Sequence, residues 1–106
     1  MKITPELIAW AKRAGACRDL LEQAQYRKNV EDLDVSFRLW LAWQETSSAD
    51  LLNHLSEDTN TSVRWWVADN PFTPPLALRR LLSDPSPQVR GCAFGTISRA
   101  RNPTPS

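Results

Sequence analysis

Apolar residues recur along this chain at intervals of three and four, in short runs separated by proline, glycine and small polar residues. Such intervals place side chains on one face of an α-helix. The first run begins at Pro5, behind Thr4 as a capping residue, and ends or kinks at Gly15. A second covers residues 16–28. A third runs from Leu33 to about Glu45 and is apolar nearly all round, which is typical of a central buried helix.

The second half of the chain continues in the same way with shorter helices. One is expected around Leu51–Leu55, and another over Val63–Asp69, which stops at Asn70-Pro71 because the residue before a proline avoids helical geometry. Thr73-Pro74-Pro75 begins the next, and the last begins at Val89. No alternating strand pattern of useful length occurs, so the sequence predicts an all-α protein of about seven helices.

Three of these segments carry the same residues at a constant spacing. An aspartate is followed six residues later by an arginine, and successive aspartates are 26 residues apart: Asp32 with Arg38, Asp58 with Arg64, and Asp84 with Arg90. The second and third copies share the motif Leu-x-x-Leu-x-x-Asp-x-x-x-x-Val-Arg. A fixed period of this size is typical of stacked helical repeats, which present a continuous surface to a partner.

This motif, with Asn70-Pro71-Phe72-Thr73-Pro74 between its last two copies, resembles the leucine-rich-repeat variant family and, more loosely, HEAT-like repeats. The likeness covers about residues 50–97 well and 32–43 weakly. It implies helical units stacked into a right-handed superhelix, here an α-solenoid fragment. We expect a single domain over residues 1–100, with an N-terminal helical cap (1–30), three repeat units (31–100) and a flexible tail (101–106).

The repeated aspartates and arginines have a structural interpretation. At the turn between two helices, an aspartate can accept hydrogen bonds from N–H groups at the start of the next helix. The arginine lies early in that helix and can reach an acid of its own unit or of an adjacent one, which suits its planar guanidinium. We therefore expect a structural ladder, and we favour this role over direct contact with a partner. Its members are Asp32, Arg38, Asp58, Arg64, Asp84 and Arg90.

Five tryptophans are many for a chain of 106 residues. Trp40 and Trp66 occupy equivalent positions of the period, and Cys92 has that position in the third copy, so all three are expected to point into the core. Trp65 and Trp66 cannot both do so, because adjacent helical positions differ by about 100°. One interpretation is that all five tryptophans are packed inside. The alternative is that Trp65 or Trp43 is a partly exposed anchor for a partner.

Residue types that carry chemistry are sparse. Cys17 and Cys92 are far apart, no CxxC pair exists and His54 is the single histidine, so no metal or cofactor is expected. No nucleophile positioned beside a base and no phosphate-binding glycine loop appears, so no enzyme activity is expected. A signal peptide and a run of about 20 apolar residues are both absent, and two reduced cysteines then suit a cytoplasmic protein away from membranes.

Charge is nearly balanced, at +1 overall, and gives no general argument for nucleic acid. We therefore expect a non-enzymatic protein–protein interaction module, acting as an adaptor or as an inhibitor of a larger complex. An origin in a phage or mobile element would be consistent with so small an array. The candidate contacts are Trp43, Trp65, Arg79 and Arg80.

Two other kinds of partner stay open. The chain is basic from Leu76 onward, so a patch of C-terminal arginines could bind nucleic acid through phosphate groups. Its members would be Arg79, Arg80, Arg90, Arg99 and Arg101. Self-association is the third possibility, since a last repeat unit without a cap leaves an apolar end.

Overall fold

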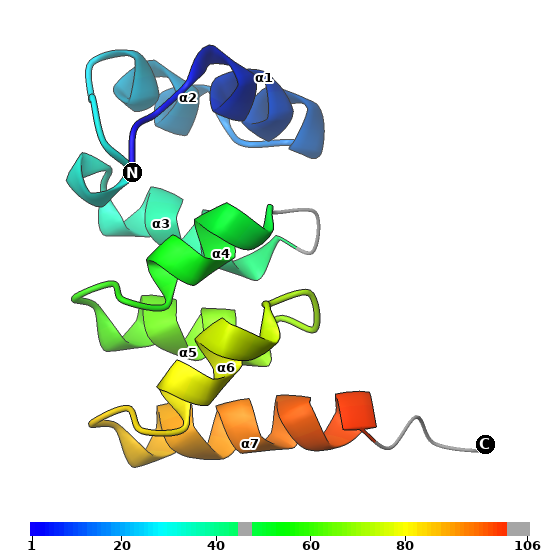
Figure 1. Ribbon diagram of the computed structural model, residues 1–106. Coiled ribbons are helices and arrows are strands. Elements are labelled where there is room, and N and C mark those ends of the chain that lie inside the picture. Colours follow the sequence, from blue (N-terminus) through cyan, green and yellow to red (C-terminus); the bar gives the residue numbers. More distant parts are fainter. Residues whose placement is uncertain (45–47, 102–106) are drawn as a thin grey trace.

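The protein folds into α-helices joined by short turns, as a computed structural model shows for residues 1–44 and 48–101 (Figure 1). Within these residues there are seven α-helices and one 3-10 turn, and the all-α prediction is confirmed. The helices are α1 (Pro5–Ala14), α2 (Arg18–Gln25), α3 (Val35–Trp43), α4 (Ala49–Leu55), α5 (Thr61–Asp69), α6 (Pro75–Leu81) and α7 (Pro87–Arg101). The 3-10 turn, η1, covers Val30–Asp32 and precedes α3.

Local sequence signals set the helix ends. The side chain of Thr4 accepts a hydrogen bond from the Leu7 N–H at 3.1 Å and starts α1. Gly15 ends that helix with a φ of 100°, a left-handed conformation that glycine adopts without steric cost. Asn60 caps α5 by accepting from the N–H groups of Ser62 and Val63, so α5 begins two residues before the expected Val63.

Three helix boundaries differ from the sequence predictions. The helix α2 is shorter than residues 16–28, and α7 begins at Pro87 instead of Val89. The helix α7 also continues through Arg101, which we had assigned to the tail, because Ile97 still packs against the core and the first proline after it is Pro103. The predicted end of α3 at Glu45 and the rest of the predicted tail, residues 102–106, lie outside the described residues.

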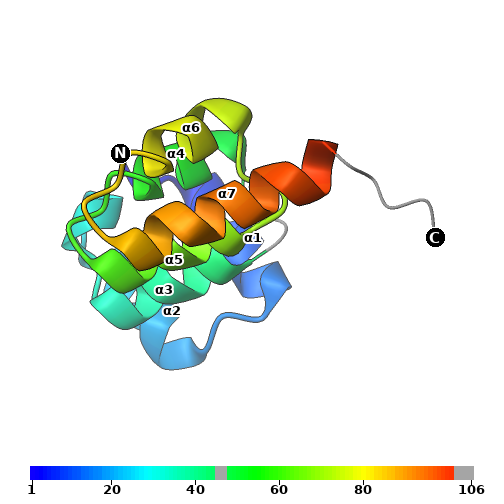
Figure 2. The same cartoon turned by 90° about the horizontal axis from the view of Figure 1, so that it is seen from below.

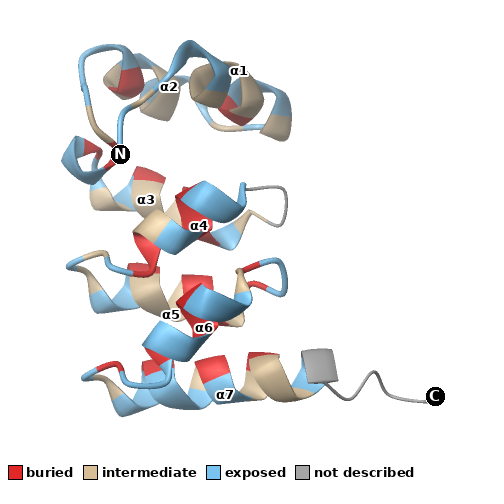
Figure 3. Ribbon diagram, in the orientation of Figure 1, coloured by how far each residue is buried: buried red, intermediate tan, exposed pale blue. Residues whose placement is uncertain are grey.

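The helices form a stack with two sides. Figures 1 and 2 show α3, α5 and α7 following one another down one side, with α4 and α6 beside them on the other and α1 and α2 at one end. The core lies between these elements. Its apolar positions recur every 26 residues and are at most 3% exposed: Phe37, Val63 and Val89 in one set, and Leu41, Val67 and Ala93 in another. The outer faces of α4 and α6 are exposed (Figure 3).

Polar side chains also join successive helices of the α3–α5–α7 side. Asn70, which follows α5, donates from Nδ2 to the Ala42 carbonyl of α3 at 3.1 Å. Thr96 of α7 donates from Oγ1 to the Ala68 carbonyl of α5 at 2.6 Å. Each donor is 28 residues after its acceptor and each bond is buried. These bonds satisfy carbonyls near helix C-termini that have no acceptor role inside their own helix.

Candidate protein-binding surface

Two buried ion pairs join successive turns of the stack. The guanidinium Nε of Arg38 in α3 lies 2.8 Å from Asp58 Oδ2, and that of Arg64 in α5 lies 2.7 Å from Asp84 Oδ2. The second pair is a well-formed hydrogen bond, whereas the Arg38 Nε–H is not directed at its carboxylate. Asp58 and Asp84 are only 6% and 5% exposed at the side chain. Each arginine therefore reaches the acid of the next unit.

The same aspartates also organise their own turns. Asp58 Oδ1 accepts from the Asn60 N–H and Asp84 Oδ1 from the Ser86 N–H, each at 2.9 Å. The Asp58 carbonyl accepts from Arg64 Nη1 at 2.8 Å, and the Asp84 carbonyl accepts from Arg90 Nη1 at 2.7 Å. Asp58 and Asp84 therefore occupy corresponding corners, and the stack places Arg64 and Arg90 in corresponding conformations.

The first predicted member of the ladder does not fit this geometry. Asp32 is exposed in η1, and its carboxylate accepts from Asn29 Nδ2 at 3.4 Å. Among the described residues it has no ion pair with an arginine, and Arg38 donates to the Leu33 carbonyl instead. The reason is the added turn η1, which moves Asp32 out of register. Asp34 caps α3, and hydrogen bonds from Ser36 lower the pKa of its carboxyl group.

The tryptophan side chains form two ring contacts across neighbouring helices. Trp10 of α1 lies 5.7 Å from Trp40 of α3 between ring centroids, and Trp43 of α3 lies 6.4 Å from Trp66 of α5 at 82°. Trp65 contacts Trp66 edge-on at 4.9 Å. Trp43 is 57% exposed, whereas the other four are partly buried. Trp40 and Trp66 are thus not fully inside as expected, because each has one side covered by another tryptophan and one side open.

These rings border a shallow groove of about 430 Å³ between α3 and α5. Its lining consists of Ser36, Leu39, Trp40, Trp43 and Trp66, and we call it the tryptophan groove. None of these side chains carries a charge. A charged group placed here would lose its hydration without gaining an opposite charge, so the groove is suited to apolar groups.

The four predicted partner contacts do not form one surface. Trp43 and Trp65 lie on α3 and α5, whereas Arg79 and Arg80 lie on α6, on the other side of the stack. Arg79 is exposed. Arg80 is engaged within the protein, since its Nη1 lies 3.0 Å from Glu57 Oε1 and donates to Ser56 Oγ at 2.9 Å.

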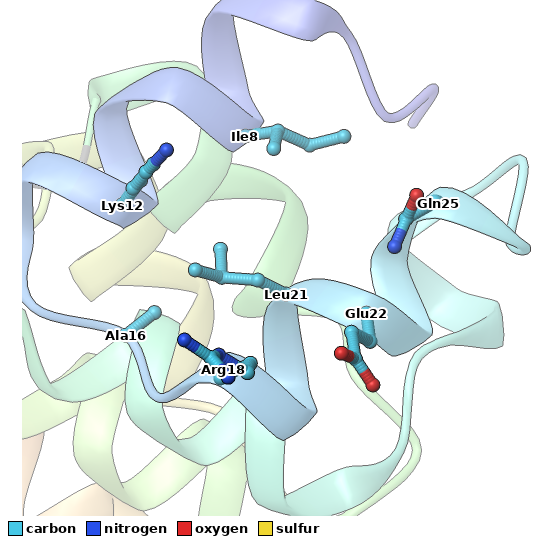
Figure 4. A pocket seen from close by; sticks show the side chains of 7 residues that line it. All are labelled: Ile8, Lys12, Ala16, Arg18, Leu21, Glu22 and Gln25. Atoms are coloured by element: carbon cyan, nitrogen blue, oxygen red, sulfur yellow. The ribbon is translucent and has the colours of Figure 1, made fainter.

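Two further hollows contain residues of both charge signs. One, of about 630 Å³, lies between α1 and α2, where Ile8 and Leu21 come from opposite helices and charged side chains such as Lys12 and Glu22 surround them (Figure 4). The other lies beside His54, whose Nε2 is 2.9 Å from Glu31 Oε1. The sequence gave no signal for this pair, because the two residues are 23 positions apart and meet only through the stacking of η1 against α4.

Glu31 also accepts from the N-terminal ammonium group of Met1 at 3.0 Å. That hydrogen bond, a backbone hydrogen bond and the nearby His54 lower the pKa of Glu31 to about 2. Met1 and Val30 are joined through a backbone bond of 2.8 Å as well, so this cluster closes the N-terminal end onto the stack.

The cysteines have different surroundings and both are free thiols. Cys92 lies partly buried beside Asp69 at 3.6 Å, and burial followed by the negative charge of Asp69 raises the pKa of the thiol to about 11. Cys17 is exposed, although its spacing had favoured burial, because α2 begins after it at Arg18. Among the described residues, no group of three potential metal ligands comes together and no helix is long and apolar enough to cross a membrane.

Comparisons with protein-family models, curated proteins and solved structures found no match to this chain. The resemblance to leucine-rich-repeat variants therefore stays a prediction that rests on the repeated motif. The arguments about function rest on the geometry of the chain itself.

Proposed function

We propose that this protein is a non-enzymatic, cytoplasmic interaction module that binds an apolar segment of another protein in the tryptophan groove. By occupying that segment it would act as an adaptor or as an inhibitor of a larger complex. The observation that carries the proposal is Trp43, a large aromatic side chain that is 57% exposed at the edge of an uncharged groove.

The energetics of such a contact are favourable. A tryptophan buries about 150–250 Å² when it is fully covered, so covering the exposed part of Trp43 removes roughly 100 Å² from water. At about 25 cal/mol per Å² this contributes about 2–3 kcal/mol, or roughly a 30- to 150-fold gain in affinity. The contact with Trp66 restricts the ring before binding, which reduces the entropy lost in the complex.

The charge arrangement supports a protein partner over nucleic acid. Two arginines of the C-terminal set already have carboxylate neighbours: Arg80 lies 3.0 Å from Glu57, and Arg99 lies 3.7 Å from Asp69. Each such pair reduces the positive potential available to phosphate groups. The tryptophan groove has no positive residue in its lining.

Affinity capture with tagged full-length protein tests the proposal. Wild type is compared with Trp43→Ser and with the control Tyr26→Ser, since Tyr26 is 84% exposed and lies at the end of α2 away from the groove. We expect a host protein that is retained by wild type and Tyr26→Ser, and purified partner should bind Trp43→Ser at least about 30-fold more weakly.

Equal binding of the partner to Trp43→Ser would exclude the groove as the binding site. Titration with duplex and single-stranded DNA at low and moderate salt examines the alternative partner. A strong, salt-sensitive interaction with DNA would favour nucleic-acid binding instead.

A further inference from the structure

The contact between successive helices of the α3–α5–α7 side has two recurring parts. At one end, an arginine meets an aspartate 20 residues later, as in Arg64 with Asp84. At the other end, a side chain of the next unit donates to an alanine carbonyl 28 residues before it, as in Thr96 with Ala68. The alanine itself is fully buried under the next helix. The same arrangement joins α3 to α5 and α5 to α7.

The outer face of α7 repeats only the first half of this contact. Arg90 has the position of Arg64 in the period, and Phe94 has that of Ala68. In the described part of the chain no further helix covers α7, as the view along the stack shows (Figure 2). Arg90 is exposed and Phe94 is 65% exposed.

The guanidinium of Arg90 is already oriented for a second contact. Its Nη1 donates to the carbonyls of Asp84 and Pro85 at 2.7 and 3.2 Å, much as Arg64 Nη1 donates to the Asp58 carbonyl. In Arg64 the Nε atom binds the carboxylate of the following unit. Among the described residues Arg90 has no carboxylate within ion-pair distance.

Phe94 sets a different requirement from the buried alanine. A helix cannot approach α7 as closely as α7 approaches α5, because a phenylalanine stands where the inner contact has a methyl group. Whatever covers this face must therefore offer an apolar recess to the ring. Arg90 and Phe94 are four residues apart on one helix, so they share a face and can meet one partner together.

We propose that the outer face of α7 is a second docking site, which binds a helical segment of a partner protein carrying a carboxylate for Arg90 and an apolar recess for Phe94. The carboxylate would take the place that Asp84 has beside Arg64. A charged hydrogen bond from an arginine held in advance provides specificity, and burial of the aromatic ring provides most of the affinity.

A second copy of the chain satisfies these requirements less well. Two α7 faces brought together would place Arg90 against Arg90 with no exposed acid between them, since the one carboxylate near it, Asp84, is buried against Arg64. Like charges at such a contact oppose association. The site differs from the tryptophan groove, so it goes beyond the proposed function and gives the protein two separate faces for an adaptor.

Selection from a phage-displayed library of single-helix peptides tests the proposal on the full-length protein. Enriched peptides are synthesised and titrated against wild type and against Phe94→Ala, Arg90→Glu and Trp43→Ser. Phe94→Ala restores the residue found at the equivalent position of α5, so it should fold, and circular dichroism at 222 nm verifies this. The matched control is Phe72→Ala, which removes a phenylalanine that is 60% exposed elsewhere.

We expect peptides rich in Asp or Glu beside an apolar position, whose affinity falls at least about tenfold for Phe94→Ala and Arg90→Glu and is unchanged for Phe72→Ala and Trp43→Ser. Replacing the acid of such a peptide with lysine should restore binding to Arg90→Glu. The proposal is overturned if selection yields no peptide that distinguishes Arg90→Glu from wild type. Peptides sensitive to Trp43→Ser alone would preserve the proposed function while excluding the α7 site, and failure of both would exclude both.

Two measurements examine other occupants of the same face. Sedimentation at several concentrations that revealed a dimer lost in Phe94→Ala would show that a second copy covers α7. Salt-sensitive binding of duplex DNA that is lost in Arg90→Glu would assign the face to nucleic acid. Either result would overturn the proposal.

Discussion

Replacing Asp84 with asparagine should destabilise the protein strongly, because it leaves the Arg64 guanidinium without its carboxylate in a place that water reaches poorly. The side chains of Arg64 and Asp84 are 14% and 5% exposed, and their closest atoms are 2.7 Å apart. At an effective dielectric constant of about 20 the attraction at this separation is about 6 kcal/mol before the cost of desolvation is subtracted. Asparagine retains an oxygen for the Ser86 N–H, so the substitution removes the charge and preserves the turn.

Removing one member of a buried pair typically costs about 3–5 kcal/mol. Arg64 keeps its bonds to the Asp58 carbonyl and to Thr61 Oγ1, so we expect a loss near 3 kcal/mol for Asp84→Asn. For a chain of this size that loss corresponds to a urea midpoint lower by roughly 2–3 M. Urea unfolding followed by tryptophan fluorescence and by circular dichroism measures it.

A double-mutant cycle separates the ion pair from general disruption. Arg64→Met with Asp84→Asn should be more stable than the sum of the single effects implies, by at least about 1.5 kcal/mol. Glu57→Gln is the matched control, because Glu57 also meets an arginine at 3.0 Å but is 63% exposed, and it should change stability by less than about 0.5 kcal/mol. Additive single effects, or a loss for Asp84→Asn no larger than that for Glu57→Gln, would refute the reasoning.

Three further predictions concern pH, thiol reactivity and the buried bonds between helices. The N-terminal ammonium group is the main cause that lowers the pKa of Glu31 from 4.5 to about 2, so the stability from this carboxylate is complete above pH 4.5 and is lost as the pH falls towards 2. Urea titrations should show a smaller acid-induced loss for Glu31→Gln, by less than about 1 kcal/mol because the side chain is exposed; an unchanged acid profile would contradict this. In the folded protein at about pH 8, iodoacetamide should modify the exposed Cys17 much faster than Cys92, whose pKa is raised to about 11, and peptide mass spectrometry would detect equal rates if this were wrong. Thr96→Val should lower the unfolding free energy by about 1–2 kcal/mol, because the Ala68 carbonyl loses its buried donor, whereas Thr96→Ser should lose less.

Several features of the candidate sites could be predicted from the repeat, and others could not. The period of 26 residues identified Asp58, Arg64 and Asp84 as related positions, and the structure brings them together at the turns. The same period misplaced Asp32, since a pattern of residue types does not reveal that the backbone makes an extra 3-10 turn before α3. The grouping of Trp43 with Arg80 as one surface also failed, because α3 and α6 lie on different sides of the stack.

The sequence by itself determined the helices, their caps and the buried positions that repeat between them. These depend on local backbone preferences and on apolar side chains within a few residues of one another. Only the tertiary structure decided that Trp43 is exposed beside a groove, that Glu31 meets His54, and that Arg90 and Phe94 face outwards at the end of the stack. These properties depend on which helix covers which face, and the spacing along the chain does not specify that.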